Sequence, residues 1–199
     1  MSWKMVNLGS VCKIVNGGTP KSEVADYWDG ELNWITPKDM GKLKTKEVND
    51  TERKITEKGL KNSSAKMLPV NSIILSSRAP IGHLAINKVL MATNQGCKGL
   101  IPNKELNFNY LYYYLFCSKQ LLNDLGSGAT FKELSGSKLA EVEIPLPLLS
   151  IQLRIVESLD AIFTEIERAT AATENKLNEF KNIKQSILQQ AFNGELVKE

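Results

Sequence analysis

The segment IQLRIVESLDAIFTEIERATAATENKLNEFKNIKQSILQQAF, residues 151–192, decides the fold because it contains no Pro or Gly and repeats apolar side chains at spacings of three and four. This pattern predicts a single long helix. At 1.5 Å per residue the helix would be ~60 Å long. Alternating a and d positions of a heptad repeat give it a seam that runs from Ile155 to Ile187 and weakens only in its middle.

A lone helix of this length would leave its apolar stripe in water, so the seam needs a partner. The rest of the chain offers no second long helix, and the partner is therefore another copy or a different protein. Ala169, Thr173 and Lys176 form the middle of the seam, and its polar members either fix the register of the pair or are a local defect. We expect the interface to be made by Ile155, Leu159, Ile162, Ile166, Phe180, Ile183 and Ile187.

Short, mixed elements fill the part before this helix. One strand is predicted in residues 8–18 and ends in a Gly-Gly turn, and another is predicted in residues 32–40 and is stopped by Pro37. Residues 69–77 and 84–94 are predicted to form a hairpin-like unit with a turn near Asn87-Lys88. Residues 51–66 predict a short exposed helix ended by Gly59, and residues 109–128 a more apolar helix. Its tyrosines, which could stack on bases, are better explained by core packing; they are Tyr110, Tyr112, Tyr113 and Tyr114.

Pro145 and Pro147 force an extended path and mark a boundary. The predicted fold class is therefore a mixed α/β (α+β) globular domain over residues 1–146, followed by one long coiled-coil-type helix and a C-terminal tail over residues 147–199.

Charge is divided unevenly along the chain. Residues 1–140 hold 19 basic and 12 acidic side chains, a net +7, and residues 141–199 hold 6 and 10, a net −4, which together give the overall +3. A basic globular part and an acidic tail indicate that the first meets a polyanion and the second meets protein. Neither a transmembrane segment nor a signal peptide is present in the sequence, so we expect a cytoplasmic protein.

Candidate catalytic and metal sites are missing from the sequence. Three cysteines, Cys12, Cys97 and Cys117, form no CxxC pair, and His83 is the only histidine, so a structural zinc site is hard to assemble and buried reduced thiols are expected. There is no phosphate loop, no HExxH, no GxSxG and no [DNS]-P-P-[YFW] methyltransferase loop. We therefore expect a non-catalytic protein that binds no metal.

Seven sequence motifs carry a resemblance to one family. They are W-x4-LGSVCKIVNGGTPK (3–21), YWDGELNWITPKDM (27–40), ITEKGLKNSSAKMLP (55–69), ILSSRAPIGHLAI (74–86), NQGCKG (94–99), IPLPLLSIQLRIV (144–156) and QSILQQAFNGELV (185–197). In this order they resemble one half of the DNA-specificity subunit of type I restriction-modification systems. Members usually carry two recognition domains and two helices, whereas this chain has one of each. Leu148, Leu149 and Ile151 also depart from the usual boundary motif, which leaves the contact made by Gln152 open.

The resemblance implies a target-recognition domain and a helix that pairs with its counterpart and docks methyltransferase subunits. It assigns methylation and cleavage, with S-adenosylmethionine, ATP and magnesium, to partner subunits, so none of these cofactors is expected on this chain. The expected partners are double-stranded DNA, a methyltransferase subunit, a restriction subunit through the complex, and a second copy of the chain.

Direct readout of DNA needs Arg, Asn or Gln at base edges and Lys, Ser or Thr at phosphates. The candidates in polar loops are Lys21, Lys38, Arg78, Asn94, Gln95, Thr130 and Lys132. For each one, a solvated surface residue or a structural hydrogen bond is the alternative. The rival functions are a coiled-coil adaptor that binds no DNA, an inactive half-subunit cassette, and an enzyme with an unfamiliar site.

Overall fold

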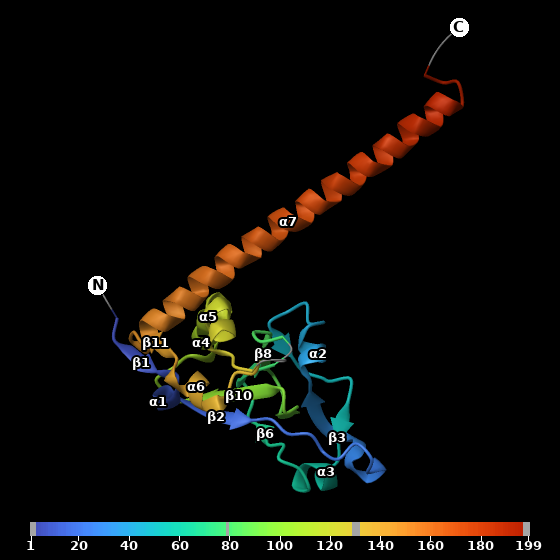
Figure 1. Ribbon diagram of the computed structural model, residues 1–199. Coiled ribbons are helices and arrows are strands. Elements are labelled where there is room, and N and C mark those ends of the chain that lie inside the picture. The colour runs from blue at the N-terminus through green and yellow to red at the C-terminus, as the bar shows by residue number, and fades with distance from the viewer. Residues whose placement is uncertain (1–2, 79, 129–131, 197–199) are drawn as a thin grey trace. The chain divides into compact units, whose positions relative to one another are not determined.

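The computed structural model describes residues 3–78, 80–128 and 132–196 (Figure 1). The chain divides into two compact units, Met1–Arg154 and Ile155–Glu199. The first unit mixes strands and short helices, and the second is helical over most of its length. Within the described residues, no helix is both long enough and apolar enough to cross a membrane.

A five-stranded sheet lies at the centre of the first unit. Its strands follow the order β2 (Cys12–Asn16), β10 (Cys97–Pro102), β7 (Ile73–Ser76), β8 (Leu84–Asn87) and β4 (Glu47–Val48). Neighbours from β2 to β8 pair antiparallel, and β4 pairs parallel with β8. All four residues of β7 are buried, as expected for a strand whose sequence is a continuous apolar run.

A second sheet has the order β5 (Lys54–Ile55), β3 (Trp28–Ile35), β9 (Met91–Thr93) and β6 (Met67–Leu68). The register of β3 against β5 shifts between Trp28 and Leu32, and Asp29 has a φ of 56°. This bulge bends the strand. The ring centroids of Trp28 and Trp34 consequently lie 5.2 Å apart, although six residues of a regular strand would span about 20 Å.

The main hydrophobic core joins the two sheets, because it contains buried side chains from both. Ile74 and Ala85 come from the five-stranded sheet, and Ile35, Leu68 and Met91 come from the four-stranded sheet. A smaller cluster around Trp34 and Ile55 contains buried residues of the neighbouring strands β3, β5 and β9 of the second sheet. The short strands are therefore held by packing between sheets.

Short helices and a small sheet complete the first unit. A two-stranded antiparallel sheet of β1 (Met5–Asn7) and β11 (Glu143–Pro145) ties its beginning to its end. A Cβ at Gly9 of α1 (Leu8–Val11) would lie 2.9 Å from Ala140 Cβ of α6 (Gly136–Glu141), so these helices pack tightly. The remaining helices are η1 (Ala25–Tyr27), α2 (Pro37–Met40), α3 (Glu57–Lys61), α4 (Phe108–Cys117) and α5 (Lys119–Leu125).

Most predicted elements are confirmed. β7 and β8 form the expected antiparallel hairpin, and the chain turns after Asn87 before β9 begins. β3 ends at Ile35 and Pro37 starts α2. The fold class is confirmed as a mixed sheet and helix domain followed by a long helix.

Three local predictions are wrong. Gly59 does not end its helix, which continues to Lys61; a Cβ there would lie 2.4 Å from Tyr27 O, so Gly59 permits a close approach. The predicted helix over residues 109–128 is two helices that break at Ser118, whose hydroxyl donates to Tyr114 O. Residues 8–11, expected in a strand, form α1.

The cysteine prediction holds for two of the three residues. Cys12 and Cys97 are buried, and burial raises the pKa of each thiol to about 12. Cys117, the last residue of α4, is exposed. Tyr110 is buried as predicted, whereas Tyr112, Tyr113 and Tyr114 are half-buried.

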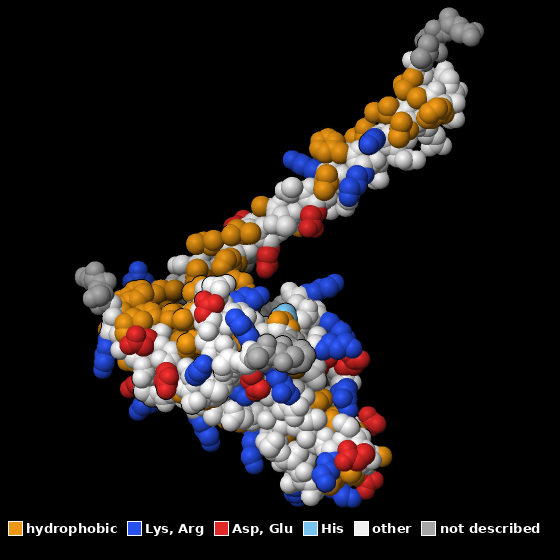
Figure 2. Space-filling view, in the orientation of Figure 1, with side chains coloured by type: hydrophobic (Ala, Val, Ile, Leu, Met, Phe, Trp, Pro, Cys, Tyr) orange, Lys and Arg blue, Asp and Glu red, His pale blue; other side chains and the backbone are white. Residues whose placement is uncertain are grey.

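The second unit holds most of α7 (Leu149–Phe192), a helix of 44 residues. At 1.5 Å per residue it is about 66 Å long. It begins two residues before the predicted start at Ile151 and ends at the predicted Phe192. Hydrophobic side chains form a stripe along it (Figure 2).

Candidate nucleic-acid interface

The predicted Gly-Gly turn is not a turn in the structure: Gly17 and Gly18 continue from β2 and lie against the loop that joins β9 to β10. Gly17 N donates to Cys97 O at 3.1 Å, and Gly18 N donates to Thr93 O at 2.8 Å. A Cβ at Gly17 would lie 2.0 Å from Asn94 O, so only glycine allows this approach. Lys21 follows this Gly-Gly segment with an exposed side chain, and its carbonyl accepts from Trp28 Nε1.

Asn94 shapes the loop in which it lies. Its Nδ2 donates to Thr19 Oγ1 at 2.9 Å, and its Oδ1 accepts from Gly96 N at 2.8 Å. Gln95, between them, is exposed. The Asn94 amide therefore makes structural hydrogen bonds, while the loop presents Gln95 outward. These two bonds use one of the two N–H groups and one of the two oxygen lone pairs of Asn94, so one of each remains for a ligand.

Pro37, Arg78 and the Asn94 loop meet around Gly96. A Cβ at Gly96 would lie 3.1 Å from Pro37 Cγ, 3.1 Å from Asn94 Oδ1 and 3.3 Å from Arg78 Cγ. Lys38 is the exposed second residue of α2, whose first turn is fixed by a capping box between Thr36 and Asp39. Three segments that are far apart in the sequence thus meet here, and they carry Lys38, Arg78 and the amide side chains of Asn94 and Gln95.

Arg78 belongs to a group of charges that the sequence analysis did not find. The Glu133 carboxylate lies 3.7 Å from Arg78 Nη1 through one oxygen and 3.6 Å from Lys98 Nζ through the other. Lys132 is exposed beside Glu133. Thr130, also predicted to bind DNA, lies outside the described residues. Lys98 is within the motif NQGCKG, but no local signal links it to Glu133.

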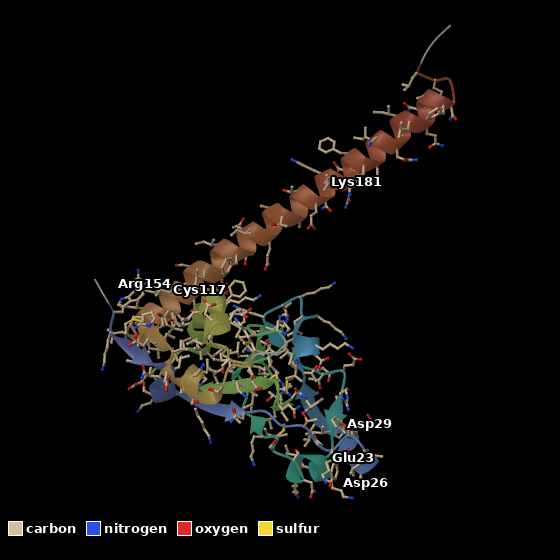
Figure 3. All side chains as sticks on the ribbon, viewed as in Figure 1. Glu23, Asp26, Asp29, Cys117, Arg154 and Lys181 are labelled. Atoms are coloured by element: carbon tan, nitrogen blue, oxygen red, sulfur yellow. The ribbon has the colours of Figure 1, made fainter. Side chains whose placement is uncertain are left out.

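Acidic side chains gather at another part of the first unit. Glu23, Asp26 and Asp29 lie near one another at η1 and the start of β3 (Figure 3). Lys58 donates to the Asp26 carboxylate at 2.6 Å, which lowers the pKa of Asp26 and raises that of Lys58. Among the described residues no group of three or more His, Cys, Asp or Glu is arranged to hold a metal ion.

Taken by itself, α7 exposes most of its predicted seam. Ile162, Ile166 and Phe180 are 55%, 53% and 66% exposed, and Ile183 and Ile187 are about half exposed. Ile155 and Leu159 are half-buried. At the centre, Thr173 Oγ1 donates to Ala169 O at 2.8 Å. This polar seam residue is therefore satisfied within its own helix.

Relatives of known sequence agree with the motif pattern. The family model described as type I restriction modification DNA specificity domain matches residues 1–182. The chain is 39% identical over 175 residues to the type I restriction enzyme MjaIX specificity subunit of Methanocaldococcus jannaschii, covering 86% of this chain and 40% of that protein. It is 34% identical over 171 residues to the EcoR124I/EcoR124II specificity subunit of Escherichia coli, with 82% and 41% covered. It thus spans about two fifths of these relatives.

Solved structures share the fold. A chain described under complex assembly and conformational transition of the type I R-M system superposes with a TM-score of 0.80 at 29% identity, covering 98% of this chain and 46% of that one. The HsdS subunit from Thermoanaerobacter tengcongensis gives 0.72 at 27% identity with the same coverage. This chain therefore belongs to the family of type I restriction-modification DNA specificity domains.

Proposed function

We propose that this chain reads DNA sequence for a type I restriction-modification complex and is not itself an enzyme. Residues 1–146 would be the target-recognition domain, and residues 147–199 the dimerisation and methyltransferase-docking part. The observation that carries the proposal is the meeting of Pro37, Arg78 and the Asn94–Gln95 loop around Gly96, since Lys38 directly follows Pro37. Methylation and cleavage, with S-adenosylmethionine, ATP and magnesium, would belong to partner subunits.

The group around Gly96 has the chemistry of a DNA reader. Arg can donate two parallel hydrogen bonds to guanine O6 and N7 or to a phosphate, and Gln can pair with adenine N6 and N7. Lys38, Gln95 and Lys132 are exposed. Lys38 and Lys132 would contribute the sequence-independent attraction to phosphates, which weakens as salt rises.

The proposed partner of α7 is a second copy that runs antiparallel. In such a pair centred on residue 171, Ile155 faces Ile187, Leu159 faces Ile183 and Ile162 faces Phe180, since the members of each pair are equidistant from 171. Each apolar position then meets an apolar one. The five central residues, 169–173, are all Ala or Thr and allow the two helices to approach closely.

Lys176 favours the antiparallel direction. In a parallel pair each seam residue would face its own copy, and two Lys176 ammonium groups would meet inside the interface. In the antiparallel pair Lys176 faces Ile166, on which its methylene groups can lie while the ammonium reaches water. The like-charge contact is thereby avoided.

A twofold pair would carry two identical recognition domains and read two identical half-sites in inverted orientation. The proposed target is therefore an interrupted palindrome, whose half-sites are separated by roughly one turn of DNA, about 34 Å, or somewhat more. The helix pair would act as the ruler that sets this separation.

Light scattering of the purified chain, alone and mixed with a type I methyltransferase subunit, tests the proposal. Twice the chain mass of 22.2 kDa, about 44 kDa, and growth on adding methyltransferase are expected. The methylated sites would then be mapped and should be interrupted palindromes. A 22.2 kDa monomer that ignores the methyltransferase would contradict the proposal and favour the adaptor or the inactive cassette. Methylation or cleavage by the chain alone would favour an enzyme.

A further inference from the structure

Glu133 bridges two cations that come from different strands. Its two carboxylate oxygens face Lys98 Nζ at 3.6 Å and Arg78 Nη1 at 3.7 Å. Arg78 follows the end of β7, and Lys98 lies on the neighbouring strand β10. One carboxylate therefore links a residue fixed in the central sheet to the Arg that lies beside the Asn94 loop.

Lys98 is the fixed end of this link. Its side chain is only 7% exposed, and its strand is paired on both sides, to Asn16 of β2 and to Leu75 of β7. A buried ammonium requires a carboxylate or equivalent partner. In the part of the chain that the structure describes, Glu133 is the acidic residue in ion-pair contact with Lys98.

The backbone holds Glu133 in place as well. Ser127 and Glu133 exchange two main-chain hydrogen bonds, of 3.1 and 2.9 Å, and Leu134 N donates to Ser77 O at 2.9 Å. Ser127 and Glu133 therefore lie side by side next to the end of β7. Arg78, whose side chain is 37% exposed, retains N–H donors for a ligand beyond the one that faces Glu133.

We propose that Glu133 is a positioning residue for DNA recognition, which acts by holding the Arg78 guanidinium at a fixed orientation from an anchor on Lys98. The fixed guanidinium then offers its remaining N–H groups to a pair of acceptors on DNA, either two phosphate oxygens or guanine O6 and N7. This inference rests on the proposed DNA-reading function.

The first experiment removes the charge of Glu133 and keeps its shape. The complex with the methyltransferase subunit is used to select its preferred duplex from a library with a random central segment, and affinity is measured for that duplex and for a scrambled one. We expect Glu133→Gln to lower the preference roughly tenfold, a size typical of coupling within one ion-pair network. Glu141→Gln, at an exposed position of the same domain, is the matched control and should keep the preference.

A second variant separates positioning from folding. Glu133→Gln leaves the Lys98 ammonium buried without its partner and should lower the melting temperature. Adding Lys98→Met replaces the ammonium by an apolar side chain of similar length and should restore the melting temperature. The DNA preference should stay low, because Arg78 still lacks its carboxylate. If the melting temperature and the DNA preference both recovered in the double variant, the role of Glu133 would be merely structural and the inference would be overturned.

A third measurement tests whether Glu133 acts through Arg78. Arg78→Met should weaken binding more than Glu133→Gln does, and the double variant should bind no worse than Arg78→Met alone. If the double variant lost affinity by the product of the two single losses, the two residues would act independently and the inference would be overturned.

The pattern of the affinity loss also identifies the acceptor on DNA. A uniform loss over all duplexes would identify phosphate, and a relaxed preference at one base pair would identify guanine. Wild-type preference retained by Glu133→Gln would overturn this inference alone, whereas a wild-type complex without any preference would overturn the proposed function with it.

Discussion

Gln152 is the residue on which the first turn of α7 depends. It is fully buried, and its Oε1 accepts from Asn107 N at 2.8 Å while its Nε2 donates to Glu105 O and Pro147 O, both at 2.9 Å. The sequence left the contact of this residue open because all of its partners are main-chain atoms, and two of them lie more than forty positions away. No side-chain pattern reports such a contact.

Replacing Gln152 by Leu should lower the free energy of unfolding by about 1–3 kcal/mol, since buried main-chain groups would lose their hydrogen-bond partner. Urea unfolding at a single protein concentration measures the change. Gln120→Leu is the matched control, because Gln120 is exposed and bonds only to Asp124 on its own helix. Equal stability of the two variants would contradict the structural role of Gln152.

The three thiols should differ in reactivity. Since burial raises the pKa of Cys12 and Cys97 to about 12, both remain protonated at pH 8, whereas Cys117 is exposed. The thiolate is the reactive form. We therefore expect iodoacetamide at pH 8 to add one label to the native protein, on Cys117, and three after unfolding, as counted by mass spectrometry. Early labelling of Cys97 in the native protein would show that the core opens.

At the scale of elements, α7 was predictable to within two residues, because the spacing of three and four is a local property of the chain. The small strands were predictable only in part. The bulge that bends β3 and brings Trp28 onto Trp34 depends on pairing with β5, which is distant in sequence. Gly59, which looks like a helix end, is a glycine because Tyr27 lies against it.

Lys176→Leu should strengthen the helix pair, because a charged residue in a coiled-coil seam costs stability. We expect the dissociation constant to fall by roughly tenfold, measured by light scattering over a dilution series. Lys181→Leu, on the same helix outside the proposed seam (Figure 3), is the control and should change it little. The change should also admit parallel pairs, detectable by disulfide formation between cysteines placed at residue 187 in both copies. A weaker pair would exclude Lys176 from the seam.

At the scale of the whole molecule, deletion of one heptad, residues 169–175, tests the ruler. The seam stays in register because Lys176 takes the place of Ala169. Seven residues correspond to about 10 Å of helix, so the preferred spacer between half-sites should shorten by about three base pairs of 3.4 Å each. Sequencing of methylated sites provides the measurement. An unchanged spacer would mean that the helix pair does not set the separation.

The candidate interface was predictable as a set of segments and not as an arrangement. Lys38 was named because it follows Trp-Ile-Thr-Pro and Gln95 because it is an amide side chain in a polar loop, and both are exposed. Glu133 was missed because its partners, Arg78 and Lys98, precede it by 55 and 35 positions (133 − 78 and 133 − 98). Only the folded sheet brings these three together.

The hydrogen bonds of Gln152 also bear on how such a protein can change. All three of its partners are backbone groups: the N–H of Asn107 and the carbonyls of Glu105 and Pro147. Any amino acid would supply the two carbonyls, and any except proline would supply the N–H. The joint therefore does not depend on which side chains the domain carries. A domain with an entirely different surface could therefore offer Gln152 the same three backbone partners. Under the proposed function, the recognition surface could then change while this joint stays the same.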